Sequence, residues 1–170
     1  MEGVPPAWTK NHPVSNVQWV SAELVYANDY NPNKVAPPEM KLLRRSIEAN
    51  GYTQPIVVWR TEYGLEVVDG FHRNIVGKEL GFTHLPVVII NEDSTERGDR
   101  IAATIRHNRA RGKHQISAMS DIVVELSRRN WSDKKIGKEL GMDPDEVLRL
   151  KQITGLAELF ADEEFSEAWE

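Results

Sequence analysis

The sequence predicts an α+β fold, and three observations support this prediction. Short runs rich in β-branched residues occur in the first half of the chain, between turn-rich segments and one-sided helical patterns. Some of these runs are joined by a tight turn and others by a helix, so the predicted sheet contains strands of both directions. From Thr95 onward the strand-like runs stop and only helical patterns follow. The expected architecture is a mixed sheet with helices, followed by an all-helical part.

Residues 1–16 contain three prolines and no periodicity, which indicates a flexible arm. Residues 17–27 alternate loosely and predict a strand followed by an extended piece. After the turn-rich segment 28–34, apolar residues recur at helical spacing over 37–51, where Gly51 suits the end of a helix.

The next segments complete the predicted sheet. The short β-branched runs 55–60 and 65–69 flank a turn glycine and predict a β-hairpin. A second helix is predicted over 70–81, and the apolar run 85–90 predicts an interior strand.

Helical patterns make up the rest of the chain, over 97–112, 116–130 and 132–153. The last pattern splits at Gly141, because Ser132 can cap one helix and Asp143, with Glu146 in a capping box, can cap the next. Two short helices joined by a tight turn that contains a glycine form the helix-turn-helix pattern.

The composition restricts the class of protein. Of 170 residues, 40% are apolar and 28% are charged, as in a soluble globular protein. The chain has no cysteine, which excludes disulfides, thiolate metal ligands and thiol chemistry. No apolar run approaches the roughly 18 residues of a membrane span, and the first residues lack a signal-peptide core. We therefore expect a cytoplasmic protein that does not bind membranes.

The charge is unevenly distributed along the chain. The net charge is −5, yet segment 97–113 carries six basic residues and one acid, and every charged residue after Lys151 is acidic. This asymmetry is typical of a basic site for an anion together with an acidic tail. A solvated helix face and a frayed tail would explain it equally well.

The first candidate site is the segment Asp69-Gly70-Phe71-His72-Arg73, where a strand passes into a helix. The free N–H groups of a helix start can bind phosphate, and Gly70 allows a close approach. Arg73 can hold phosphate through two N–H groups, and His72 can donate to phosphate or transfer a proton. The alternative interpretation is that Asp69 caps the helix and His72 only packs.

A second candidate site lies in the sequence RHNRAR. Arg106, Arg109 and Arg111 fall within six residues and repel one another on a helix unless an anion relieves the repulsion. A triphosphate or a nucleic-acid backbone would suit these arginines and the neighbouring Asn108. The alternative is a solvated surface helix.

A third candidate is the turn segment NPNK, in which Asn31 and Lys34 can contact phosphate or a base. Turn formation alone also explains its Asn-Pro pair. The chain has no GxxxxGK[ST] loop, no HExxH and no Cys/His zinc spacing, so any nucleotide chemistry does not use a P-loop.

Taken in order, these segments resemble the ParB/sulfiredoxin superfamily over about residues 17–155. The stretch NPNKVAPPEMKLLRRSIEANGYTQPIVVWR resembles the family's opening, and VVDGFHRNIVGKELGFTHLPVVII resembles its GERR segment. RHNRAR lies where ParB proteins carry ENxxR, with Asn108 and Arg111 matching. The implied parts are a flexible arm (1–16), a ParB/sulfiredoxin-like nucleotide-binding domain (17–95), a helical domain with a helix-turn-helix (96–155) and an acidic tail (156–170).

The resemblance also narrows the implied chemistry. Phe71 replaces the cysteine of sulfiredoxins, which excludes their reaction. Phe71-His72 replaces a Glu-Arg pair of ParB clamps, and His107 replaces their metal-holding glutamate, which argues against CTP-dependent clamping. The His-Arg pair is shared with branches that bind adenine nucleotides. The resemblance therefore implies ATP or ADP, rather than CTP, with Mg²⁺ held through the nucleotide near Asn108.

DGFHR, ATIRHNRARG and the helical tail most resemble the IbrB-like regulators, which are encoded beside a phosphoadenosine-phosphosulfate-reductase-like protein. The resemblance implies such a partner, and a homodimer is a further expectation. In the predicted recognition helix, Arg149 and Lys151 are the candidates for DNA contact. The acids at the start of that helix oppose phosphate contact.

Three hypotheses remain open from the sequence. The first is a nucleotide-binding ParB-like regulator of DNA or transcription. The second is an ATPase or an ATP/ADP-dependent kinase of a small molecule such as serine, in which Asp69, His72 or Glu23 would handle protons. The third is a protein-interaction module with a vestigial pocket.

Overall fold

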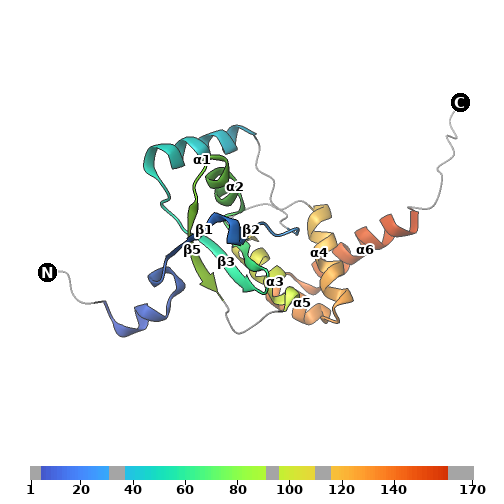
Figure 1. Cartoon of the computed structure of the whole chain (residues 1–170). Coiled ribbons are helices and arrows are strands. Elements are labelled where there is room, and N and C mark those ends of the chain that lie inside the picture. The colour runs from blue at the N-terminus through green and yellow to red at the C-terminus, as the bar shows by residue number, and fades with distance from the viewer. Residues whose placement is uncertain (1–4, 31–36, 91–95, 110–115, 161–170) are drawn as a thin grey trace, which may run out of the picture. The chain divides into compact units, whose positions relative to one another are not determined.

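A five-stranded sheet organises the first part of the chain in the order β1-β5-β3-β4-β2 (Figure 1). The computed structural model describes residues 5–30, 37–90, 96–109 and 116–160. The strands are β1 (Gln18–Ser21), β2 (Val25–Tyr26), β3 (Ile56–Thr61), β4 (Gly64–Asp69) and β5 (His84–Ile90). The chain divides into two units, Met1–Asn108 and Arg109–Glu170, and each is described by itself.

The sheet is mixed, as predicted. Strands β3 and β4 form the expected antiparallel hairpin, and β5 lies between β1 and β3 as an interior strand. The strand and the extended piece predicted over 17–27 are two short strands at opposite edges of the sheet, because the 3-10 turn Ala22–Leu24 redirects the chain between them. The segment before β1 contains two further 3-10 helices, Ala7–Asn11 and Pro13–Ser15.

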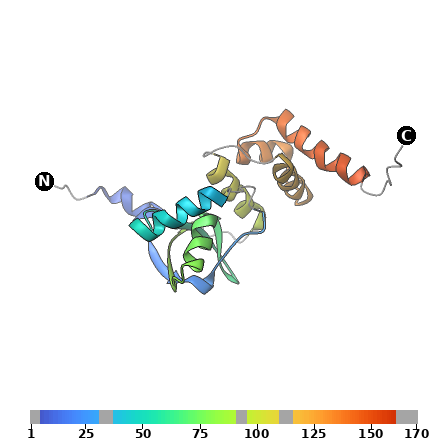
Figure 2. The same ribbon diagram turned by 90° about the horizontal axis from the view of Figure 1, so that it is seen from above.

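Helices cover both faces of the sheet. Helices α1 (Pro37–Asn50) and α2 (Phe71–Glu79) contact each other and lie next to each other in Figure 2. Phe71 packs on the core face formed by side chains such as Ile56 and Val58. Side chains alternate along a strand, so Trp59 points to the opposite face. There it packs with Ala103 of α3 (Arg97–Arg109), which places α3 in the first unit.

Two side chains fix α2 against the sheet. The Tyr52 hydroxyl donates to the Arg73 carbonyl at 2.7 Å. A Cβ atom at Gly77 would lie 2.0 Å from the same hydroxyl, so only glycine allows this contact. In the last turn of α2, the Lys78 ammonium donates to the Val25 carbonyl of β2 at 2.5 Å.

The second unit contains the predicted helix-turn-helix. Its helices are α4 (Ile116–Arg128), α5 (Asp133–Leu140) and α6 (Pro144–Phe160). The Ser132 hydroxyl caps α5 by accepting the Lys135 N–H at 3.2 Å, as expected. Gly141 ends α5 with a φ of 67°, and a Cβ at Gly137 would lie 2.7 Å from the Met142 carbonyl oxygen. Helix α6 is longer than predicted and reaches Phe160.

Candidate functional site

Strand β4 passes into α2 through Gly70, whose φ of 92° is accessible mainly to glycine. Gly70 is the N-cap residue and offers no side chain to the first turn. The first helical hydrogen bond runs from the Asn74 N–H to the Gly70 carbonyl at 2.9 Å. The N–H groups of Phe71, His72 and Arg73 therefore precede the helical ladder. Together with the helix dipole, these N–H groups form a backbone geometry suited to an anion.

Arg73 lies directly over this turn. Its Nη2 atom is 3.6 Å from Oδ2 of Asp69, and its Nη1 atom donates to Oε1 of Gln54 at 2.5 Å. A Cβ at Gly70 would lie 3.0 Å from Nε and Nη2 of Arg73, so glycine leaves the space that the guanidinium uses. The structure thus brings Asp69, Gly70 and Arg73 together. It adds Gln54, which sequence reasoning did not single out although it lies within the QPIVV segment.

Asp69 positions its neighbours. Its carboxylate is buried, and Oδ1 accepts the Gly70 N–H at 2.8 Å while Oδ2 faces Arg73. A carboxylate held in this way orients the guanidinium and the turn. These contacts favour a positioning role over that of a general base, which must reach a substrate proton.

His72 lies two residues after Gly70 and packs edge-on against the Phe71 ring, with ring centroids 5.3 Å apart. Burial lowers the pKa of His72 below its usual value of 6.5. The imidazole is therefore neutral at pH 7, with one nitrogen that donates and one that accepts. In this state His72 can donate to a phosphate oxygen without adding charge.

Of the remaining predicted nucleotide contacts, Arg106 and Asn108 belong to the described residues. Arg106 is exposed on α3, and Asn108 is buried near its end. Within the described ranges, no hydrogen bond or ion pair joins Asn108 to the start of α2. Asn31, Lys34 and Arg111 lie outside the described residues, so their contribution stays a prediction.

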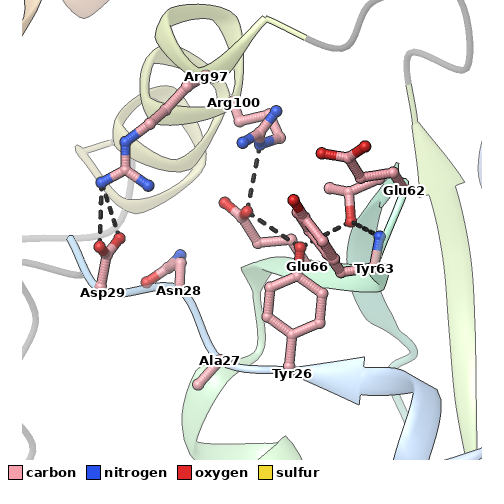
Figure 3. Close-up of a pocket in the computed structure, with 10 residues that line it drawn as sticks. Tyr26, Ala27, Asn28, Asp29, Glu62, Tyr63, Glu66, Arg97 and Arg100 are labelled. Atoms are coloured by element: carbon pink, nitrogen blue, oxygen red, sulfur yellow. Dashed lines mark hydrogen bonds and ion pairs between the residues drawn. The ribbon is translucent and has the colours of Figure 1, made fainter.

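A separate cavity of about 500 Å³ lies between the first turns of α3 and strands β2 and β4 (Figure 3). Its lining is polar and carries both signs of charge. It consists of Tyr26, Ala27, Asn28, Asp29, Thr61, Glu62, Tyr63, Glu66, Arg97 and Arg100. No residue of the first candidate site lines it.

Glu66 is the centre of the polar wall in Figure 3. Its buried carboxylate lies 3.2 Å from Nε of Arg100 and accepts a hydrogen bond from the Tyr30 hydroxyl. Burial, reinforced by the neighbouring Glu66 charge, raises the pKa of the Tyr30 hydroxyl, so Tyr30 remains a hydrogen-bond donor. Arg97 adds a second link, since its Nη2 atom donates to both oxygens of Asp29, at 2.9 and 3.1 Å. These contacts fasten α3 to the sheet.

Asn28 completes this wall. Its Nδ2 atom donates to the Val67 carbonyl at 2.6 Å, whereas Oδ1 is buried with no hydrogen-bond partner among the described residues. Sequence reasoning missed this cluster. The available signal was Glu66, a charged residue inside the apolar run LEVVD, because a charge in a buried strand requires partners.

The predicted DNA contacts on α6 are poorly placed for phosphate. Arg149 is exposed but lies beside a hollow of about 630 Å³ that Asp143, Asp145 and Glu146 also line. Lys151 is half-buried and pairs with Asp133 of α5. Arg149 therefore lies among carboxylates, and Lys151 is paired with one.

The described part of the chain contains no cluster of three or more His, Cys, Asp or Glu side chains that could hold a metal ion. None of the described helices combines the length and the hydropathy that a membrane span requires.

Comparisons with known proteins agree with the two-part organisation. Residues 8–108 match the family model of the ParB N-terminal domain, and residues 114–162 match that of the IbrB-like C-terminal HTH domain. Over 167 residues the chain is 58% identical to "Uncharacterized protein YbdM" of Escherichia coli (strain K12), covering 94% of this chain and 78% of that protein.

Solved structures confirm the fold. A Pnob8-like ParB-N domain superposes with a TM-score of 0.59 at 15% identity, covering 87% of this chain and 74% of that one. The C-terminally truncated chromosome-partitioning protein ParB from Caulobacter crescentus, complexed to the centromeric parS site, superposes with a TM-score of 0.53 at 15% identity. That match covers 84% of this chain and 76% of the other. The α+β fold and the ParB/sulfiredoxin resemblance are thereby confirmed.

Proposed function

The chain belongs to the ParB N-terminal domain family, and we propose that it is a nucleotide-binding regulator that acts on DNA or transcription. The nucleotide phosphates would bind at the start of α2, and the helix-turn-helix would contact DNA. The C. crescentus ParB of the same fold is complexed to its parS site, which supports the DNA part of this proposal.

The observation that carries the nucleotide part is the turn at Gly70. Three backbone N–H groups precede the helical ladder there, no N-cap side chain competes for them, and Arg73 lies over the same turn. Asp69 and Gln54 hold the guanidinium in place before a ligand arrives. A phosphate would meet N–H donors and a fixed cation together, which is the arrangement that binds phosphoryl groups strongly.

The remaining contacts follow the family motifs. We propose that Asn108 and Arg111 approach the phosphates and that Asn31 and Lys34 flank the nucleotide. Magnesium would enter with the phosphates, near Asn108, because the described protein groups do not form a metal site of their own. We expect ATP or ADP to bind more tightly than CTP, since Phe71 and His72 stand where CTP-binding relatives carry Glu and Arg.

Thermal unfolding with a nucleotide panel tests this proposal. At about ten times the dissociation constant, a ligand adds about 1.4 kcal/mol, or several degrees in Tm for a domain of this size. We expect a shift with ATP or ADP plus magnesium, its loss in Arg73→Gln, and its retention in Arg45→Gln, an exposed arginine on α1. No shift with ATP, ADP or CTP would overturn the nucleotide part and favour an interaction module.

The same samples separate a regulator from an enzyme. Steady release of ADP or phosphate that Asp69→Asn abolishes would show that the site is catalytic. The contacts of Asp69 indicate that it positions Gly70 and Arg73. We therefore expect the protein to bind nucleotide, and we expect no nucleotide turnover that depends on Asp69.

A further inference from the structure

Helix α5 has an exposed basic face. Lys134, Lys135 and Lys138 are all exposed, and at 3.6 residues per turn they fall within an arc of about 100°. The opposite side of the helix is buried and consists of Ile136, Gly137 and Leu140. The three lysines therefore point together away from the core of the second unit.

These lysines are not neutralised by carboxylates nearby. Lys134 and Lys138 make no ion pair within the described part of the second unit. Lys135 lies over the Trp131 ring, 3.6 Å from its centroid, which holds the ammonium at the surface without cancelling its charge. Like charges at i and i+4 repel on a helix, so an anion bound between Lys134 and Lys138 would relieve this repulsion.

Helix α6 presents the opposite charge. In the usual docking of a helix-turn-helix, the first residues of the second helix reach the base edges. Here that position carries Asp145 and Glu146 beside Asp143. Phosphates repel carboxylates, so the start of α6 cannot provide the electrostatic part of DNA affinity.

Helices α5 and α6 are also fixed relative to each other. Gly137 lies so close to the Met142 carbonyl that a Cβ would approach to 2.7 Å, and the Lys151 ammonium of α6 pairs with Asp133 of α5. The basic face and the acidic helix start therefore belong to one rigid motif.

From these observations we propose that the helix-turn-helix binds the DNA phosphate backbone through Lys134, Lys135 and Lys138 of α5, and not through the first turn of α6. This assignment rests on the proposed function, because it specifies the DNA contact of that regulator. Phosphate contacts carry no direct sequence information, so binding through α5 has little sequence preference. Lysines that neutralise phosphates release the counterions of DNA, so this binding is sensitive to salt.

Salt-dependent binding of the full-length protein to a fluorescent 20-base-pair duplex of arbitrary sequence tests the assignment. Each phosphate contact contributes about 0.9 to the slope of log K against log salt. We expect Lys134→Gln/Lys138→Gln to lower the slope by about 2 and the affinity at low salt at least tenfold. This double variant keeps Lys135 over Trp131, so the fold of the motif is preserved.

Two matched variants make the experiment decisive. Lys10→Gln/Lys41→Gln removes the same charge from exposed positions of the first unit and should leave the slope unchanged. Arg149→Gln tests the rival surface on α6 and leaves the pair between Lys151 and Asp133 intact. In an independent readout, duplex DNA should slow the acetylation of Lys134 and Lys138 by at least threefold, measured by mass spectrometry, and should leave Lys41 unaffected.

The outcomes separate this inference from the proposal on which it rests. Wild-type binding that the α5 double variant leaves unchanged, with a loss in the α6 variant, overturns the α5 assignment and leaves the DNA function intact. Wild-type protein that binds no duplex at low salt, with or without nucleotide, overturns the DNA function and the assignment together. A slope that falls in the α5 variant, and does not fall in the α6 variant or in the first-unit variant, establishes the α5 lysines as the DNA-binding surface.

Discussion

Strand β4 carries two buried carboxylates three residues apart, and their surroundings differ. Glu66 is enclosed by the Tyr30 hydroxyl and the Arg100 guanidinium, which come from other elements and fasten α3 to the sheet. Asp69 is bound to its own neighbours, the Gly70 N–H and Arg73, at the start of a helix whose first N–H groups precede the ladder. The difference indicates that Glu66 holds the fold together, whereas Asp69 prepares a binding surface.

Replacing Glu66 should have the largest effect. Glu66→Ala leaves Arg100 and Tyr30 without their buried acceptor, and removing one partner of a buried pair costs about 3–5 kcal/mol. We expect the free energy of unfolding to fall by this amount, measured from the hydrogen-exchange protection of β3 and β4 across a urea series. The exposed neighbour Glu62→Ala should change the stability by less than about 0.5 kcal/mol. Equal losses in the two variants would contradict a structural role for Glu66.

Gly70→Ala and Gly81→Ala form a matched pair at the two ends of α2. Both residues have positive φ, 92° and 80°, so each substitution should cost about 1–2 kcal/mol of backbone strain. A Cβ at Gly81 meets nothing within 4 Å, whereas a Cβ at Gly70 meets Arg73. The nucleotide-induced rise in Tm should therefore be lost in Gly70→Ala alone. A loss in both variants would assign the effect to general destabilisation.

Asp69→Asn should separate stability from binding. The amide oxygen can still accept the Gly70 N–H, whereas the ion pair with Arg73 is lost, at a cost of about 1 kcal/mol. Because the carboxylate holds the Arg73 guanidinium in place, its loss should weaken nucleotide binding roughly three- to tenfold, measured by titration calorimetry. Tighter binding would show that the carboxylate mainly repels the phosphates and does not prepare the site.

The smallest effect concerns pH. The pKa of His72 is lowered in the folded state by burial, so the unfolded chain binds more protons below about pH 6.5. Stability should therefore fall as the pH drops from 6.5 through the folded pKa, by less than about 1 kcal/mol because the ring is partly solvated. His72→Gln should flatten this part of the profile between pH 7 and pH 5. An unchanged profile would assign the acid loss to other groups.

The sequence could predict those parts of the fold that depend on residues close together in the chain. The hairpin 55–69 and the turn at Gly70 follow from residue types within a few positions of one another, as does the cap at Ser132. The sheet order and the split between β1 and β2 depend on pairing between distant segments, which no local pattern contains.

The same distinction applies to the site. Asp69, Gly70 and Arg73 lie within five residues, so their proximity could be predicted. Gln54 reaches Arg73 across 19 positions, and Tyr30 reaches Glu66 across 36. Only the folded sheet brings these pairs together.

The fastening of α2 has a kinetic consequence. Tyr52 holds the Arg73 carbonyl, and Lys78 ties the far end of the helix to β2. A phosphate-binding site that is already formed needs no slow rearrangement before it binds an anion. The observed rate of nucleotide association in stopped-flow mixing should then rise linearly with nucleotide concentration as a single exponential, without a plateau. Diffusion and charge would then set the association rate. The release of the phosphate from Arg73 would set the dissociation rate.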